Sequence, residues 1–284
     1  MLTGMVNHAL LTENIQSYSR TSRLPIIVTF LSIRPFFIVY IYFPRCHLTI
    51  MGSPEVEIVN LSGTGLPRQE ARKAAVWMAK AFARAPATPA LTMFFGAAPY
   101  EDNVEMHERF WAAHLNRVAM SGILLAARDI GGGVDWGTYH GFRAFFEPGK
   151  ARSPYSADFR LDDNEDWDRY LELAGQKKYE ERLVEWGEKT AKTNEGLDDL
   201  NIPGCYTTSI IVVDPEYQRR GIGRALDEHT RKTVRDAGRQ LHVRIHEYIL
   251  PFYLAQGYRV MTSATYTLQG SKPFVVHFLL HEVK

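Results

Sequence analysis

One run of the chain, residues 210–226, joins a strand to a helix through a basic turn that contains two glycines. The β-branched residues Ile210–Val213 predict a buried strand, which stops before Pro215 because proline has no N–H for the ladder. A helical pattern follows from about Gly221, and Gly238 suits the position just after its end. Glycines leave the backbone accessible, and the first turn of a helix has unpaired N–H groups that favour negative charge. The run therefore predicts a cradle for a pyrophosphate.

Other phosphate-binding patterns fit this run less well. A dinucleotide fingerprint needs Gly-x-Gly-x-x-Gly directly after the strand, but Leu226 stands at the third glycine position and residues 214–220 intervene. A P-loop needs Gly-Lys-Ser/Thr, which does not follow the glycines here. The plain alternative is an ordinary strand-to-helix turn with a solvated basic pair.

A second constellation covers residues 241–258. Apolar and polar residues alternate from Leu241 to His246, which predicts a strand with one buried face. Pro251 suits the first turn of a short helix, and Gly257 is placed to end that helix.

Together the two constellations resemble motifs A and B of the GNAT superfamily of acyl-CoA-dependent N-acyltransferases. The family patterns are Gln/Arg-x-x-Gly-x-Gly/Ala and Tyr-x-x-x-Gly-Phe. The matching residues are Gln218, Gly221 and Gly223 in the first motif and Tyr253, Gly257 and Tyr258, a tyrosine in place of phenylalanine, in the second. His246 stands where the family often has asparagine; histidine keeps the hydrogen-bonding capacity, but the detailed contact with the pantetheine arm is not implied by the resemblance. The chain's length and its insert also look like those of fungal members.

The resemblance covers about residues 55–284 and implies the fold and the site. The expected fold is α/β (α+β), with a mixed, mostly antiparallel sheet that splays between the two motif strands and is flanked by helices. The pantetheine arm of acetyl-CoA, the cosubstrate, would enter the gap, and its pyrophosphate would lie on the start of the motif A helix. The implied CoA-binding residues are Ile211, Val212, Val213, Gln218, Arg219, Arg220, Gly221, Ile222, Gly223 and Arg224.

The resemblance also assigns catalytic roles. Tyr253 would protonate the departing CoA thiolate, since a phenol near the sulfur can donate its proton as charge develops. Backbone N–H groups near Val212 and Val213 would stabilise the oxyanion. The base that takes the proton from the amine is expected to be Glu247 or His246, acting directly or through water. A structural role for each of these residues is the alternative.

The expected activity is acetyl transfer from acetyl-CoA to an amine, on a small molecule or a protein. Direct attack in a ternary complex is expected, because neither motif contains a cysteine that could carry the acyl group. Two other classes stay open: a CoA-binding protein without catalysis, and a membrane-tethered acyltransferase.

Composition excludes little but is consistent with this interpretation. The 284 residues carry a net charge of +1 and are 45% hydrophobic, so a real core is expected and no global field attracts nucleic acid. Cys46 and Cys205 are too few for a disulfide framework and fit a reducing, cytoplasmic compartment. No Cys/His spacing is typical of zinc, and no metal is expected. The oligomeric state stays open.

The first fifty residues differ from the rest. Residues 24–43 are apolar enough to span a bilayer as a helix, but Arg34 and Pro35 stand in the middle. We expect residues 1–50 to be a leader or accessory segment outside the fold, with a membrane anchor as an alternative, and residues 51–284 to form the catalytic domain.

The rest of the chain predicts the elements that position the motifs. Helices are expected at 66–84 and 101–120, and strands at 56–61, 123–127, 139–146, 260–268 and 274–281. A charged insert at about 150–203 predicts helix from Asp166 to Lys192, with Leu171, Leu173, Leu183, Val184 and Trp186 on its inner face. The acidic run from Asp162 to Asp166 would attract a cationic amine or simply be solvated.

Overall fold

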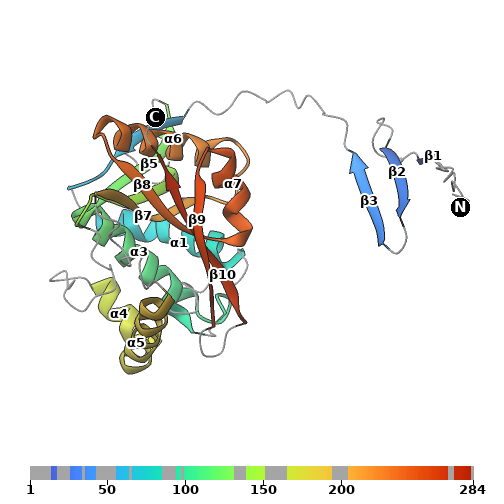
Figure 1. Cartoon of the computed structure of the whole chain (residues 1–284). Coiled ribbons are helices and arrows are strands. Elements are labelled where there is room, and N and C mark those ends of the chain that lie inside the picture. Colours follow the sequence, from blue (N-terminus) through green and yellow to red (C-terminus); the bar gives the residue numbers. More distant parts are fainter. Residues whose placement is uncertain are drawn as a thin grey trace, which may run out of the picture. The chain divides into compact units, whose positions relative to one another are not determined.

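The computed structural model describes residues 14–17, 26–33, 36–42, 56–63, 66–84, 94–96, 99–130, 139–150, 165–193, 204–267 and 272–282 (Figure 1). The chain divides into two compact units, Met1–Gly52 and Ser53–Lys284.

The described part of the first unit is a three-stranded antiparallel sheet in the order β1-β2-β3. Its strands are β1 (Asn14–Ser17), β2 (Ile26–Ile33) and β3 (Phe36–Tyr42). Most of the apolar stretch 24–43 is thus two paired strands, where the anchor hypothesis requires one long helix. Across the described residues, every helix is too short or too polar to cross a membrane.

In the described part of the second unit, seven strands form one sheet in the order β4-β5-β6-β7-β8-β10-β9. The strands are β4 (Val56–Asn60), β5 (Ile123–Asp129), β6 (Tyr139–Phe146), β7 (Cys205–Val213), β8 (Gln240–His246), β9 (Arg259–Tyr266) and β10 (Phe274–His281). The helices are α1 (Arg68–Arg84), α3 (Val104–Ser121), α4 (Glu165–Ala174), α5 (Gln176–Thr193), α6 (Ile222–Asp236) and α7 (Leu250–Ala255), with the 3-10 turn η2 (Glu247–Ile249) before α7. All neighbouring strands are antiparallel except β7 and β8, which confirms the expected mixed, mostly antiparallel fold.

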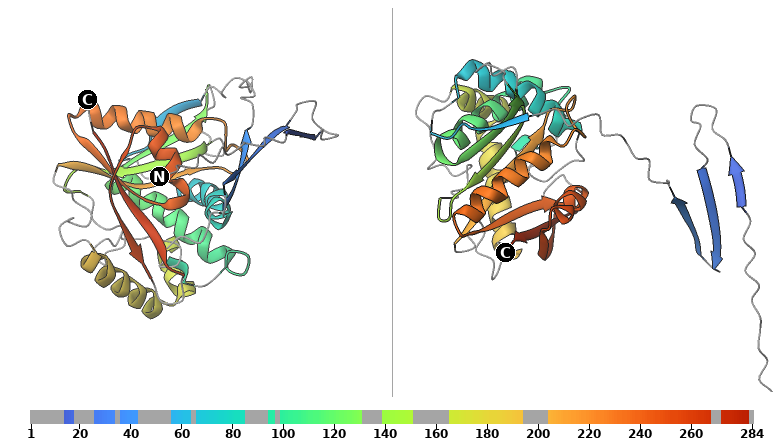
Figure 2. Two further views of the ribbon diagram at one scale, coloured as in Figure 1. Left: turned by 45° about the vertical axis from the view of Figure 1, so that its right-hand side comes forward. Right: turned by 90° about the horizontal axis from the view of Figure 1, so that it is seen from above.

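Helices cover both faces of this sheet (Figures 1 and 2). Neighbouring residues of a strand point to opposite faces, and β6 shows what each face meets. Phe142 stacks on Trp77 of α1, with ring centroids 5.5 Å apart. A Cβ on Gly141 would lie 3.1 Å from side-chain atoms of Ile222 and Leu226, so α6 packs closely on the other face. The glycine lets the start of α6 approach the sheet.

The sheet opens in its middle, between β7 and β8. These parallel strands pair only from Cys205–Thr207 to Gln240–His242, and β7 continues for six more residues without β8 beside it. Ser209 is an extra residue in the β6–β7 register, which makes a β-bulge at the start of the gap. The strand predicted as buried at Ile210–Val213 is therefore half-exposed except at Val212, because its neighbour is missing.

The insert forms two helices, α4 and α5, as the sequence predicts, with a break at Gly175, whose φ is +73°. The predicted inner face is partly wrong: Leu173 and Val184 are exposed. Aromatic side chains form the contact with the core instead. Tyr170 and Tyr179 are buried, and the Tyr170 hydroxyl donates to the carbonyl of Phe94 over 2.6 Å.

A buried carboxylate fastens α4 to α1 and α3. Asp166 is 2% exposed and accepts from Arg72 at 2.8 Å and from Arg109 at 2.7 Å, with Arg68 at 3.4 Å. Asp166 and Glu165, which pairs with Arg68 and Arg72, are thus engaged within the protein. For Asp166 this contradicts the expectation that the acidic run is solvated or attracts an amine, whereas Glu165 is exposed to solvent. Residues 162–164 lie outside the described residues.

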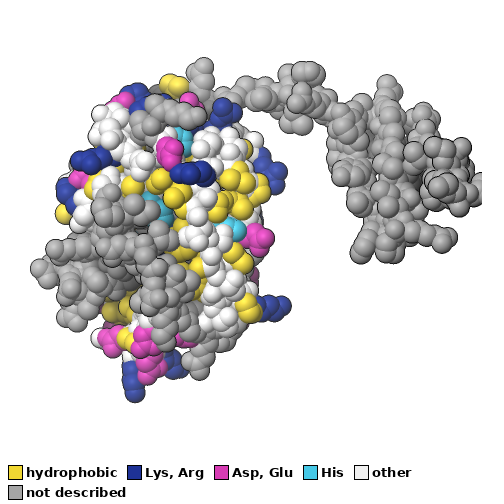
Figure 3. Space-filling view, viewed as in Figure 1, with side chains coloured by type: hydrophobic (Ala, Val, Ile, Leu, Met, Phe, Trp, Pro, Cys, Tyr) yellow, Lys and Arg dark blue, Asp and Glu magenta, His cyan; other side chains and the backbone are white. Residues whose placement is uncertain are grey.

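Charged side chains of both signs are interspersed over the face shown in Figure 3. This fits the net charge of +1. Exposed apolar residues include Leu254 of α7 and Val260 and Met261 of β9.

Replacing Asp166 by alanine is expected to destabilise the protein. The substitution leaves three arginines side by side, and breaking a buried ion pair costs about 3–5 kcal/mol; partly exposed arginines place this case near about 3 kcal/mol. Asp168→Ala is the matched control, because Asp168 lies on the same first turn of α4 but is exposed; its effect should stay within about 0.5 kcal/mol. Urea unfolding of both variants measures the difference, and equal destabilisation would contradict the fastening role of Asp166.

Candidate functional site

A cavity of about 590 Å³ occupies the gap between β7 and the elements that follow β8. Its lining residues are Ala81, Phe82, Ile211, Val212, Val213, Tyr217, Gln218, Arg219, Gly221, Ile222, Gly223, Arg224, Tyr248, Ile249, Phe252 and Gln256. The lining comes from β7, the loop before α6 and the turn η2, with α1 on one face of the sheet and α6 and α7 on the other. The cavity therefore passes through the sheet at the place where β7 and β8 separate.

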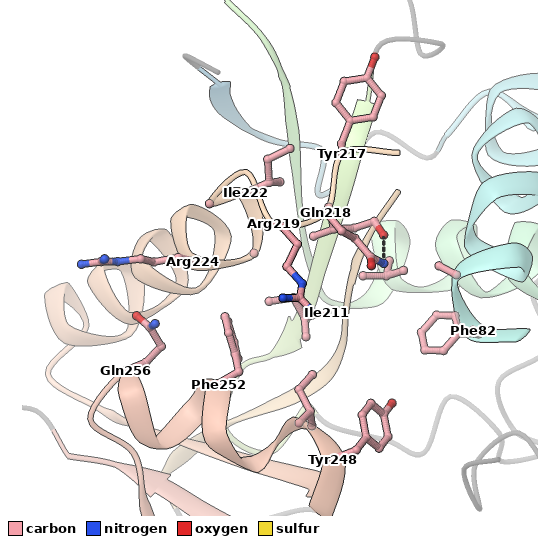
Figure 4. A pocket seen from close by; sticks show the side chains of 16 residues that line it. Phe82, Ile211, Tyr217, Gln218, Arg219, Ile222, Arg224, Tyr248, Phe252 and Gln256 are labelled. Atoms are coloured by element: carbon pink, nitrogen blue, oxygen red, sulfur yellow. Dashed lines mark hydrogen bonds between the residues drawn. The ribbon is translucent and has the colours of Figure 1, made fainter. Parts of the chain in front are cut away.

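One end of the cavity is polar and basic. Arg224 of α6 and Gln256 lie at this end, with Arg219 toward the middle (Figure 4). The first helical bond of α6 runs from the Ala225 N–H to the Gly221 carbonyl, so the N–H groups of residues 222–224 have no acceptor within the helix. The helix dipole adds positive potential at this point.

The loop before α6 has an unusual backbone. Gly221 has φ +87°, and Arg219, with φ +66°, is the one non-glycine with positive φ among the described residues. A Cβ on Gly221 would meet no protein atom within 4 Å, and a Cβ on Gly223 would meet only ordinary contacts at 3.7 Å or more. Both glycines therefore leave room beside the backbone where a side chain would otherwise stand.

The other end of the cavity is apolar. Phe82 from α1 and Tyr248 from η2 lie at this end (Figure 4), together with Ala81. Phe82 is held by stacking on Trp111, with ring centroids 4.1 Å apart. A ligand that fills the cavity would thus have an anionic part and an uncharged part on opposite sides of the sheet.

Backbone groups of β7 line the passage between these ends. The Asp214 N–H donates to the His140 carbonyl of β6, so Val212 also points to β6, while Ile211 and Val213 point to the gap. Gln218 confirms this direction, because its side-chain amide donates to the Val213 carbonyl over 3.1 Å (Figure 4). The N–H groups that face the passage therefore belong to Ile211 and Val213, and the Val212 N–H is directed to β6, contrary to the sequence expectation.

Nine of the ten residues predicted to bind CoA line this cavity. The exception is Arg220, whose guanidinium donates to the Glu216 carbonyl over 2.9 Å and lies over the ring of Tyr217, 4.8 Å from its centroid. Arg220 thus contacts residues of the loop before α6 and stabilises that loop.

Tyr253 lies deeper than the cavity lining. It is 1% exposed, and its hydroxyl oxygen accepts a 2.7 Å hydrogen bond from Arg143 of β6. Burial raises the pKa of Tyr253, although the charge on Arg143 opposes this. Tyr248, by contrast, is 46% exposed and faces the cavity.

The two predicted bases do not line the cavity. Glu247 is exposed at the end of β8. His246 is half-buried, and burial together with His277 lowers its pKa to about 4, so its ring is neutral at neutral pH and only weakly basic. No group of three His, Cys, Asp or Glu residues within the described ranges is arranged to hold a metal ion.

Sequence reasoning missed several residues of the site. Phe82 and Tyr248 line the cavity, yet each stands in an ordinary amphipathic or aromatic stretch. Arg143 and Asp227 form a buried pair outside the cavity lining, and they are 84 residues apart in the chain. Local periodicity cannot bring such residues together, although an arginine in the middle of a mostly apolar strand is a signal that it has a buried partner.

Comparisons with known proteins agree with the two motifs. Residues 200–272 match the model of the acetyltransferase (GNAT) domain family. Among curated proteins, none matches the sequence.

Solved structures with a similar arrangement include a "histone acetyltransferase HPA2 and related acetyltransferase" from Corynebacterium glutamicum, at 12% identity and a TM-score of 0.49, covering 78% of this chain and 94% of that one. Arylalkylamine N-acetyltransferase 2 from Aedes aegypti is 10% identical with a TM-score of 0.46, covering 81% and 100%. NAA60 from Arabidopsis thaliana, in complex with acetyl-CoA, is 12% identical with a TM-score of 0.42, covering 80% and 97%.

The segment that matches the family model contains the strand, glycine turn and helix of residues 205–236. The resemblance to fungal members stays a prediction. The chain carries an acetyltransferase domain of the GNAT superfamily, as its two motifs predict.

Proposed function

We propose that this protein transfers an acetyl group from acetyl-CoA to an amine, by direct attack in a ternary complex. The observation that supports this most is the cavity through the sheet, with free helix amides and arginine at one end and apolar side chains at the other. The diphosphate of CoA fits the amides of residues 222–224, and the open space at Gly221 lets it approach the backbone. The pantetheine arm would lie along β7.

The exposed edge of β7 offers the electrostatic part of the chemistry. Attack of the amine on the thioester carbonyl places negative charge on its oxygen, and the N–H groups of Ile211 and Val213 face the passage where that oxygen would lie. The bond from acyl carbon to nitrogen forms, the bond from carbon to sulfur breaks, and Tyr253 gives its proton to the sulfur. The proton that the amine loses passes to Glu247 or His246 through water and returns to Tyr253 through solvent.

The apolar end of the cavity is where we place the acetyl group and the approach of the amine. Phe82 and Tyr248 would exclude water from the thioester there, which limits its hydrolysis. The acceptor amine would belong to a small molecule or to a protein, and the full chain should be tested against both kinds of acceptor.

The decisive experiment combines binding and turnover with the full chain. Calorimetry with CoA measures whether the cradle binds the carrier, and thiol release from acetyl-CoA is followed across alkylamines, arylalkylamines, polyamines and lysine peptides. Heat on CoA addition plus amine-dependent thiol release supports the proposal. CoA binding with no release on any acceptor would favour a CoA-binding protein without catalysis, and no binding would remove the proposal altogether.

Gly223→Glu should abolish CoA binding. The new carboxylate would stand at the helix start that the diphosphate occupies, replacing a favourable charge interaction by a repulsive one. We expect at least about 100-fold weaker binding, or about 2.7 kcal/mol, by calorimetry. Gly187→Glu is the control: it adds the same charge to α5 at a position with no protein atom within 4 Å and outside the cavity, and it should leave the affinity unchanged.

Tyr253→Phe should lower kcat by about 100-fold, as the loss of a general acid does, and should change CoA affinity less than about twofold. Because burial raises the pKa of Tyr253, the phenol stays protonated through pH 9, so ionisation of this acid should cause no loss of activity below about pH 10. Tyr248→Phe discriminates between the two phenols. If it lowered kcat more than Tyr253→Phe did, the acid would be the tyrosine that lines the cavity.

A further inference from the structure

Arg143 is a fully buried cation in the middle of β6, next to the gap. Its guanidinium donates to the Tyr253 hydroxyl at 2.7 Å, to the Thr208 hydroxyl at 3.0 Å and to Asp227 at 3.3 Å. Burial acts against the charge of Arg143, but Tyr253 and Asp227 outweigh it, and the pKa of Arg143 is raised. Arg143 therefore remains charged beside the phenol.

Asp227 of α6, also fully buried, holds this cation in place. Besides Arg143, its carboxylate accepts from Arg231 at 2.9 Å and from the Tyr258 hydroxyl at 2.8 Å. The proton of the Tyr258 hydroxyl is therefore engaged in the hydrogen bond to Asp227. Of the two tyrosines in the cluster, only Tyr253 is in direct hydrogen-bond contact with Arg143.

The bond from Arg143 determines what Tyr253 can do with its own proton. A guanidinium has only donors, so the phenol oxygen must accept this bond, and its O–H is left to donate elsewhere. Among the described residues, the Tyr253 hydroxyl has no other hydrogen-bond partner. Its proton therefore has no acceptor among the described residues.

Thr208 locates the Arg143 cluster relative to the gap between β7 and β8. Thr207 is the last residue of β7 that pairs with β8, so Thr208 is the first residue at the gap. By bonding Thr208 and Tyr253 together, Arg143 ties the phenol to the start of the passage through the sheet. The cluster lies outside the cavity lining and is not in position to bind the diphosphate.

We propose that Arg143, anchored by Asp227, is a positioning residue that directs the Tyr253 proton to the departing sulfur and stabilises the phenolate left behind. This rests on the proposed acetyl transfer. As the carbon–sulfur bond breaks, the sulfur takes the Tyr253 proton, and the negative charge that appears on the phenol oxygen lies 2.7 Å from the cation. The proton lost by the amine then restores the phenol.

A double-mutant cycle tests whether Arg143 acts on the reaction through Tyr253. Arg143→Gln should lower kcat by about 10-fold or more, but by less than about threefold in a Tyr253→Phe background, because residues that act as one unit are not additive. Arg231→Gln is the matched control: it removes the same charge from the same carboxylate without touching Tyr253, and kcat should change less than about threefold. Equal effects of Arg143→Gln in both backgrounds would overturn the proposal.

A second measurement does not depend on turnover. The Tyr253 signal in protein labelled with carbon-13 at tyrosine Cζ is assigned through Tyr253→Phe and titrated without CoA. Arg143→Gln should move this titration to higher pH, because the phenolate loses its cation, and Arg231→Gln should leave it in place. An unmoved titration in Arg143→Gln would overturn the proposal.

One further variant and a measurement of CoA affinity separate positioning from misfolding. If thermal unfolding shows that Arg143→Gln does not fold, Arg143→Lys replaces it in both experiments; it keeps the charge but loses the fork, so kcat should fall while the titration stays near that of wild type. A kcat that does not fall would overturn the proposal. CoA affinity should be unchanged in every Arg143 variant, and a loss there would mean a structural role. Absence of CoA binding by the wild-type chain would instead defeat the proposed function.

Discussion

The early end of the pairing between β7 and β8 is the constraint on which the rest of this structure depends. Parallel strands normally continue side by side, and here they part after Thr207 and His242. The bulge at Ser209 adds twist to β7 at the same place. What would be a buried strand becomes an accessible edge in the centre of the molecule, with backbone N–H groups that face a passage rather than a neighbour. A ligand that lies along β7 would replace the missing strand.

An opening in the middle of a sheet needs support on both sides, and two buried ion clusters contribute to it. Arg143 of β6 and Asp227 of α6 join the sheet to the helix whose N-terminus forms the basic end of the cavity. Asp166 joins α4 of the insert to α1, which supplies Phe82 at the apolar end. Ion pairs of this kind are weak evidence for stability, because desolvation opposes the attraction. Their direction-dependent hydrogen bonds do fix how the elements lie, and that is what an opened sheet requires.

Sequence reasoning succeeded where chemistry is local. The spacing of Gln218, Gly221 and Gly223 predicts the loop and the start of α6, and most strands and helices of the second unit lie close to their predicted ranges. It failed where tertiary context decides. The exposure of Ile211 results from a strand that is absent, Asp166 is buried by arginines from two other helices, and Tyr253 meets an arginine 110 residues away. None of these leaves a trace in local periodicity.

Gly221 and Gly223 differ in what requires a glycine at each position. Gly221 has a positive φ that other residues adopt only with strain, so a glycine there is required by the backbone alone. Gly223 has no such φ, lies within the first turn of α6, and would place a Cβ at ordinary distances from Val213 and Phe252. In a helix, alanine would be more stable by about 1 kcal/mol. The contacts with Val213 and Phe252 do not require a glycine at 223. Under the proposed function, the CoA diphosphate held against the amides of the first turn would account for it, since a side chain there would crowd that group.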